Sequence, residues 1–154
     1  RAIVCTNHDY CLVIDDVLGT AEHEVELNWS LADFPVQKEH DQLKMTTPKG
    51  TLTIGIFNNS KDFELIQGVR TNEVGIWKSD YYGYKEARIG LRASQKRQLP
   101  TRLITCFGAE AWSFEQHAPT GRVVLKNDKF ILELELSRVG EKDIIRAHKY
   151  KDAN

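Results

Sequence analysis

Two segments of the chain alternate between apolar and polar residues. Within residues 23–31 (HEVELNWSL) every second residue from Val25 to Leu31 is apolar, and within residues 129–136 (KFILELEL) every second residue from Phe130 to Leu136 is apolar. A strand points successive side chains to opposite faces, so each apolar set lies on one face, whereas a helix would spread it around its circumference. Both segments are therefore predicted to be antiparallel strands with one solvent-exposed face.

Other segments have the length and composition of strands, namely 10–17, 51–57, 62–67, 85–93, 102–107, 111–115, 122–126 and 143–148. Turn-forming residues separate them at 18–20, 58–60, 127–128 and 139–141. Asn127-Asp128 predicts a two-residue hairpin, because both residues tolerate positive φ. Short strands divided by turns, without helical periodicity, indicate a sandwich or a barrel. We predict an all-β fold, an antiparallel β-sandwich of many short strands.

Composition and length narrow the class of protein. No repeat, linker or low-complexity stretch divides the 154 residues, so residues 1–154 are predicted to form a single β-sandwich domain. A formal net charge of -1 argues against a nucleic-acid partner bound through bulk positive charge. Apolar runs such as Cys11–Ile14 are far shorter than the about 20 residues of a membrane span, so none is expected. The chain begins with Arg1 and its only methionine is Met45, which indicates a mature product or an excised fragment.

The sequence offers few candidate metal ligands or catalytic nucleophiles. The three cysteines, Cys5, Cys11 and Cys106, lack zinc-ligand spacing and cannot all pair, so we expect buried small apolar residues and no disulfide framework. The five histidines are scattered, and we expect no metal and no cofactor. The sequence has neither a Gly-x-Ser-x-Gly elbow nor a glycine-rich phosphate loop.

Residues 75–86 (GIWKSDYYGYKE) concentrate aromatic and basic side chains. These are Trp77, Lys78, Tyr81, Tyr82, Tyr84 and Lys85. Aromatic faces stack on the C–H surfaces of sugars, and lysines pair with uronate or sulfate groups. Alternatively, the aromatic residues complete the core of a strand–loop–strand unit.

The same segment resembles a motif of the heparinase II/III-like proteins. Trp77, Ser79, Tyr82-Gly83 and Lys85-Glu86 are similar to the GW-x-S-x-x-YG-x-KE stretch of the C-terminal β-domain in that family. Residues 12–15 (LVID), followed by Gly19 and His23, resemble the vvvD…G…H strand pair that opens this domain. Residues 99–105 (LPTRLIT) resemble its LP-x-x-x-x-T strand, so the resemblance covers roughly residues 10 to 108.

Two positions depart from the family pattern. Ser30 stands where members often have a histidine, and Ile76 stands where a glycine usually precedes the tryptophan. The first change places a metal site of this region in doubt.

The resemblance implies a longer protein, in which a helical toroid precedes this chain as its C-terminal β-region. The implied activity is cleavage of uronic-acid polysaccharides by β-elimination, in which a base removes the proton α to the uronate carboxyl group. Family members take an Asn or His and a Tyr from the toroid, and a β-region His that would precede Arg1. No catalytic residue is assigned within this chain, and we expect the chain alone to be inactive.

These observations lead to one main hypothesis. We expect the C-terminal β-sandwich domain of a heparinase II/III-like polysaccharide lyase, or lyase-like protein, which lines a cleft for an acidic polysaccharide and docks on an upstream helical domain. Tyr82 and Lys85 are the predicted substrate-binding residues, and Trp77 is predicted to support their loop. The expected location is the bacterial periplasm or envelope. The alternative is a non-catalytic carbohydrate-binding or structural β-sandwich module.

Overall fold

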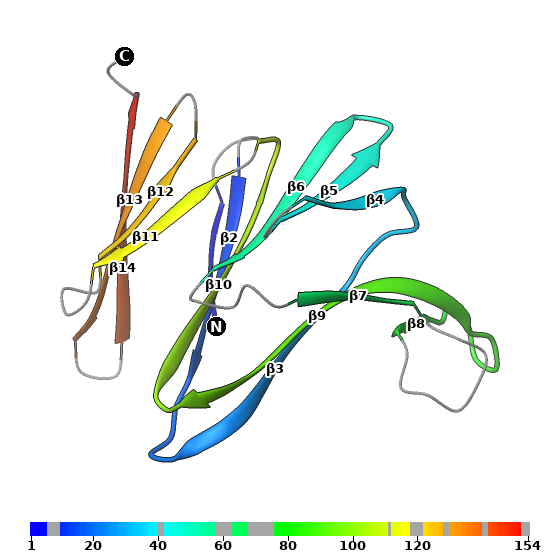
Figure 1. Cartoon of the computed structure of the whole chain (residues 1–154), viewed down its shortest axis with the longest axis horizontal. Helices are drawn as coiled ribbons and strands as arrows, with labels where there is room; N and C mark the ends of the chain where they lie inside the picture. Colours follow the sequence, from blue (N-terminus) through cyan, green and yellow to red (C-terminus); the bar gives the residue numbers. More distant parts are fainter. Residues whose placement is uncertain are drawn as a thin grey trace. The chain divides into compact units, whose positions relative to one another are not determined.

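The computed structural model describes residues 1–5, 10–39, 42–57, 63–67, 76–110, 112–117, 122–127, 130–139 and 142–151. These residues form fourteen strands and no helix, so the predicted all-β fold is confirmed (Figure 1). Within them, accordingly, no helix has the length and apolarity to cross a membrane. The predicted turns at 58–60 and 140–141, and His8, His40, Asp62, Gly75, Ala111, Asp128 and Lys129, lie outside the described residues.

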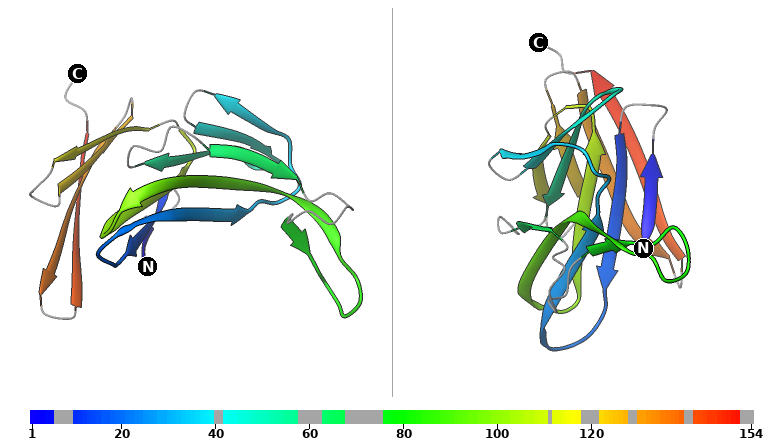
Figure 2. Two further views of the ribbon diagram at one scale, coloured as in Figure 1. Left: turned by 60° about the horizontal axis from the view of Figure 1, so that its bottom comes forward. Right: turned by 90° about the vertical axis from the view of Figure 1, so that its right-hand side faces the viewer.

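The chain divides into two compact units, Arg1–Ala109 and Glu110–Asn154. Unit 1 contains two antiparallel sheets (Figure 2). Sheet A has the order β1 (Ala2–Cys5), β2 (Tyr10–Val17), β10 (Thr101–Gly108), β6 (Gly50–Phe57), β5 (Gln42–Thr47), β4 (Val36–Glu39). Sheet B has the order β3 (Glu22–Ser30), β9 (Glu86–Gln98), β7 (Phe63–Gln67), and β8 (Ile76–Lys78) also pairs with β9. The prediction that residues 1–154 form one domain stays a prediction.

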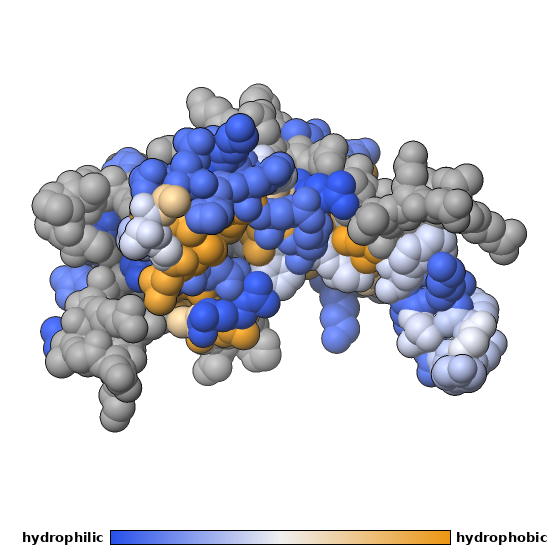
Figure 3. Space-filling view, turned by 90° about the horizontal axis from the view of Figure 1, so that it is seen from below, coloured by the Kyte–Doolittle hydropathy of each residue, from blue (hydrophilic) through white to orange (hydrophobic). Residues whose placement is uncertain are grey.

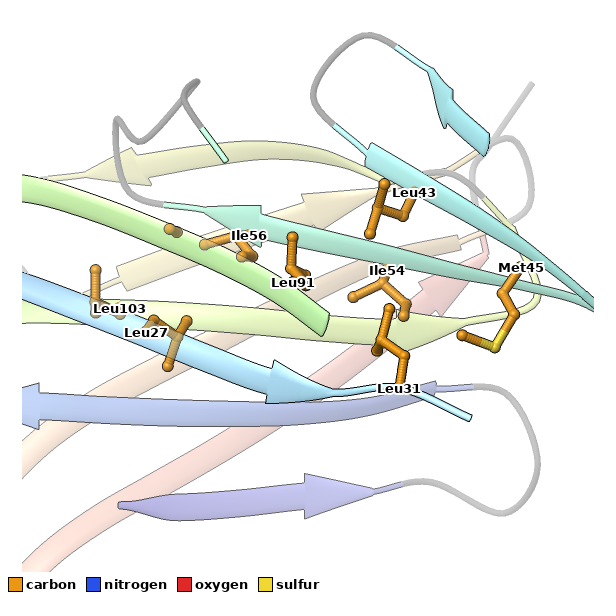
Figure 4. Close-up of a cluster of buried hydrophobic side chains, with 9 residues drawn as sticks. Leu27, Leu31, Leu43, Met45, Ile54, Ile56, Leu91 and Leu103 are labelled. Atoms are coloured by element: carbon orange, nitrogen blue, oxygen red, sulfur yellow. The ribbon is translucent and has the colours of Figure 1, made fainter. Parts of the chain in front are cut away.

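The two sheets of unit 1 enclose one apolar core. Sheet B contributes Leu27 and Leu91, which belong to one buried cluster with Leu43, Ile54 and other side chains of sheet A (Figure 4). Each fully buried leucine or isoleucine stabilises the fold by about 1.5–3 kcal/mol relative to an exposed one. The apolar side chains that alternate within residues 23–31 therefore face the interior of a β-sandwich.

Trp29 joins the sheets with a polar contact as well as an apolar one. Its indole Nε1 donates a hydrogen bond to Oγ1 of the buried Thr105, at 3.2 Å. Its ring meets that of Phe107 edge to face, with centroids 5.1 Å apart. Because the only polar atom of the tryptophan is satisfied, the ring packs between the sheets without an unpaired donor.

Unit 2 is a four-stranded meander. Its order is β11 (Ser113–His117), β12 (Arg122–Lys126), β13 (Phe130–Val139), β14 (Lys142–Lys151). At the predicted hairpin, the Asn127 N–H donates to the Phe130 carbonyl at 3.0 Å, and the Phe130 N–H donates to Asn127 Oδ1 at 2.8 Å. The alternating apolar positions of β13 are buried at Leu132 and Leu134, as expected for a strand with one buried face.

The structure adds four strands that the sequence patterns did not indicate: β1, β4, β5 and β8. β4 (VQKE) is an edge strand with three exposed polar residues, a common way to discourage pairing with other chains. β5 does alternate, with Leu43 and Met45 buried, but its short apolar set is easily overlooked. β1 and β8 are too short to show a period.

One expectation about the cysteines is wrong. Cys5 and Cys11 form a disulfide, because they lie directly opposite each other on β1 and β2. Cys106 is buried and unpaired, as expected, and its burial raises the pKa of the thiol to about 12.

Candidate functional site

The aromatic segment forms a β-hairpin at one end of sheet B. Ile76 pairs with Arg88 and Lys78 pairs with Glu86, which leaves residues 79–85 as the connecting loop. We call residues 76–88 the tyrosine hairpin. Figures 1 and 2 show that it projects beyond the sheets of unit 1. Its loop is therefore presented to solvent on a rigid two-stranded base.

The base of the hairpin is fixed by contact between Ile76 and Gly90 of β9. A Cβ atom at position 90 would lie 1.8 Å from Ile76 Cδ1 and 3.2 Å from the Trp29 carbonyl oxygen. A side chain at position 90 would displace the end of the Ile76 side chain. Ile76, which replaces the glycine usual in the resembled motif, thus has a packing role.

Hydrogen bonds within the loop place Tyr82 at its outer corner. The Tyr84 N–H donates to the Tyr81 carbonyl at 3.2 Å, and the Ser79 hydroxyl donates to the same oxygen at 3.0 Å. Gly83 has a φ of +80°, the value that a type II turn requires at its third residue and that glycine adopts at little cost. Tyr82 is the second residue of this turn, and its relative exposure is 103%.

Tyr81 and Tyr84 flank this corner as a stacked pair. Their ring centroids are 4.9 Å apart and the rings are 16° from parallel. The Tyr84 hydroxyl donates to Glu86 Oε2 at 3.1 Å, and this bond to a carboxylate raises the pKa of the Tyr84 phenol. The loop therefore presents three tyrosines, two of them held in a fixed orientation.

The charges of the hairpin are largely paired. Lys78 Nζ lies 2.7 Å from Asp80 Oδ2, and Arg88 Nη2 lies 2.7 Å from Glu86 Oε1. Lys85 instead lies over the ring of Trp77, with Nζ 4.4 Å from the ring centroid. Among the described residues Lys85 makes no ion pair, so its charge is available to a ligand anion while the indole orients it.

The structure brings the three predicted residues into one hairpin. Tyr82 and Lys85 are exposed in its loop, and Trp77 is half-buried on β8 beneath Lys85. In Figure 3 the projecting end at the lower right has the pale and blue colours of tyrosines and charged residues. The exposure of Tyr82 excludes the alternative in which it completes the core. That Tyr82 and Lys85 bind substrate stays a prediction.

The outer face of sheet B carries a polar network that was not among the predicted site residues. Asn28 Nδ2 donates to Glu26 Oε1 at 2.6 Å, and Ser94 Oγ donates to Glu24 Oε1 at 2.9 Å. Arg92 Nε lies 3.7 Å from Glu26 Oε1. β9 runs from the tyrosine hairpin directly into this face, so both surfaces share one strand. The sequence does contain a sign of this network, because the polar residues within 23–31 alternate with buried ones and so lie together on the outer face.

Within the part of the chain that the structure describes, no group of three or more His, Cys, Asp or Glu side chains is placed to hold a metal ion.

The chain was compared with known families, curated proteins and solved structures. No family model matches it, and neither a curated protein nor a solved structure is significantly similar.

Proposed function

We propose that this chain is the glycan-contacting β-sandwich domain of a heparinase II/III-like polysaccharide lyase or lyase-like protein. The observation that carries the proposal is the tyrosine hairpin, which exposes Tyr82 completely at the corner of an ordered turn. The ring and hydroxyl of a fully exposed tyrosine are available to a ligand, and the stacked Tyr81 and Tyr84 beside it add further aromatic surface.

The hairpin offers two kinds of contact to a uronic-acid glycan. The phenol of Tyr82 can donate a hydrogen bond to a sugar hydroxyl or carboxylate, and its ring can cover a C–H face of the sugar. The Lys85 ammonium, held over Trp77, can pair with a uronate carboxylate or a sulfate. Together these groups favour acidic over neutral polysaccharides.

In this proposal the chain binds and orients the polysaccharide, and the upstream helical domain supplies the base and the acid of β-elimination. A cleft wall of this kind fixes the sugar ring relative to those groups, which is a large part of what such a reaction requires. The Cys5–Cys11 disulfide agrees with the proposed periplasmic or envelope location, because disulfides form in oxidising compartments.

A second candidate, a non-catalytic carbohydrate-binding module, has one observation in its favour. All described contacts that shape the hairpin, from Ile76–Gly90 to Tyr84–Glu86, come from unit 1 itself. The described surface of the hairpin is therefore formed within unit 1.

Binding measurements test the shared part of both candidates. Calorimetry with alginate and heparan sulfate oligosaccharides should show binding to this chain, and a neutral glucan of equal length should bind more weakly. Lys85→Gln should reduce the preference for the acidic glycans and leave the neutral one unchanged. Equal affinity for all three glycans in both variants would contradict the proposal.

The lyase part requires the longer protein. Incubated with the acidic glycan that binds best, the full-length protein should generate the ultraviolet absorbance of an unsaturated uronate product. Binding without any such absorbance would favour the non-catalytic module.

A further inference from the structure

We propose that the Cys5–Cys11 disulfide is a thiol–disulfide exchange site for a small anionic thiol, and that its reduction releases β1 from the edge of sheet A. The inference is independent of the proposed function.

The position of the disulfide makes it accessible. Among the strands that the structure describes, β1 is the edge strand of sheet A and pairs with β2, where Cys5 faces Cys11. Cys5 is exposed and Cys11 is half-buried. Exchange requires a thiolate to reach one sulfur, and Cys5 offers the reachable one.

A pocket of about 440 Å³ borders the disulfide. Its walls include both cysteines, Phe107 and the turn between β5 and β6, from which Thr47 and Lys49 reach it. The turn is ordered, because the Lys49 N–H donates to Thr47 Oγ1 at 3.2 Å and the Thr47 hydroxyl donates to the Gly50 carbonyl at 2.7 Å. The pocket is largely open to solvent, so a small thiol can enter it and reach the disulfide. Lys49 is the charged residue among those that line the pocket, and its positive charge favours a thiol that carries carboxylates.

The exchange takes place in two steps. The thiolate of the small thiol attacks Cys5 Sγ, forms a mixed disulfide with it and expels Cys11 as the thiolate, which takes up a proton. A second thiolate then attacks the sulfur of the bound small molecule, which leaves as its symmetrical disulfide while Cys5 is released as a thiolate. Two electrons pass from two small thiols to the protein, and Cys5 and Cys11 become free thiols.

Reduction changes the edge of sheet A. β1 is four residues long, and its Ile3 is 63% exposed, so little apolar burial holds it in place. Without the covalent link the strand is retained by its ladder to β2 and, at its start, by Arg1, whose guanidinium donates to Asp15 and lies over the Trp29 ring. Its departure would leave the backbone groups of β2 unpaired, and an open edge of this kind accepts another strand.

The first test measures exchange in the folded protein. Wild type is incubated with glutathione, alkylated and analysed by mass spectrometry, with the urea-unfolded chain as the reference. We expect the disulfide of the folded protein to be reduced at a rate within about tenfold of that in the unfolded chain. The trapped adduct should lie on Cys5, and the buried Cys106 should not be alkylated. Native exchange about a thousandfold slower than in urea, or an adduct on Cys11, would overturn the proposal.

The second test addresses the pocket. Lys49→Gln should slow exchange with glutathione about twofold to fivefold, the size of one surface charge interaction, and leave exchange with neutral β-mercaptoethanol unchanged. Equal effects on both thiols, or none on either, would remove the anionic thiol from the proposal.

The third test follows β1 itself. Hydrogen exchange of the amides of residues 2–5 should accelerate after reduction, and equally in the variant that combines Cys5→Ser with Cys11→Ser, while those of β5 stay protected. Unchanged protection of residues 2–5 in both reduced protein and variant would show that the disulfide does not retain β1.

Discussion

Cys106 shows how burial controls the chemistry of a single residue. Its thiol lies inside sheet A, and burial raises its pKa to about 12. At pH 8 about one such thiol in ten thousand is ionised, and the thiolate is the reactive form. Cys106 therefore has no nucleophilic role at neutral pH, in agreement with its place in an apolar run of the sequence.

We predict that N-ethylmaleimide leaves Cys106 of the folded protein unmodified at pH 8 and modifies it rapidly in urea. The same burial makes folding depend on pH. Burial raises the pKa of the Cys106 thiol in the folded state above its value in the unfolded chain. The protonated thiol therefore contributes its full stability below the ordinary thiol pKa, and this contribution is lost as the pH rises toward about 12. Denaturant titrations measure the free energy of unfolding at pH 8 and at pH 10.5. The decrease between these two pH values should be smaller for Cys106→Ala than for wild type. An equal loss would contradict this assignment.

At the level of single residues, the sequence indicated which segment to examine but not how its side chains are held. Tyr82, Lys85 and Trp77 were selected from composition and motif order. Their actual arrangement depends on Ile76, Gly90 and Glu86, whose roles arise from contacts across the hairpin. The disulfide was missed for a similar reason, because the register that places Cys5 opposite Cys11 is not visible in the cysteine count.

At the level of elements, the turn of the tyrosine hairpin depends on Gly83. A Cβ at this position meets no atom within 4 Å, so the cost of substitution comes from its φ of +80° alone. Gly83→Ala should therefore destabilise the hairpin by about 1 kcal/mol and weaken glycan binding by displacing Tyr82. Gly83→Asn should recover part of the binding, because asparagine tolerates this conformation better than alanine. Full binding by Gly83→Ala would show that the turn geometry does not matter.

The base of the hairpin depends on space at Gly90. Gly90→Ala places a methyl group against Ile76 Cδ1, so the end of the Ile76 side chain must move and its packing at the base of the hairpin changes. Thermal melting should show a loss of about 1–3 kcal/mol, the usual cost of overpacking. Adding Ile76→Ala should restore part of this loss by removing the obstructing atom. If the double variant is as unstable as the sum of the two single ones, the contact is not the cause.

The strands that sequence patterns located are those with a long alternating or continuous apolar set. The predictions for 10–17 and 122–126 coincide with β2 and β12. β9 extends well beyond its predicted end, to Gln98, because its polar final residues pair with the start of β3 rather than enter a core. Pairing between neighbouring strands of a sheet, which sets such lengths, is not encoded in local hydrophobicity.

At the scale of the whole molecule, a net charge of -1 gives no general attraction for an acidic polysaccharide. Any preference for acidic glycans must then come from local groups such as Lys85. Raising the salt concentration from about 0.05 to 0.5 M should weaken binding of alginate oligosaccharides only about twofold to tenfold, as expected for one or two screened contacts. Calorimetry over this range measures the effect. A loss of several orders of magnitude would indicate an extended basic surface and contradict the account.

Substitution of Tyr82 tests most directly the proposal that this side chain contacts the glycan. Calorimetric affinity for an acidic oligosaccharide should fall strongly in Tyr82→Ala and partly in Tyr82→Phe, with melting temperatures close to that of wild type, because the side chain is fully exposed. Tyr150→Ala, at a tyrosine of unit 2 that is 49% exposed, is the matched control and should bind normally. Wild-type affinity in Tyr82→Ala, or an equal loss in Tyr150→Ala, would contradict the claim.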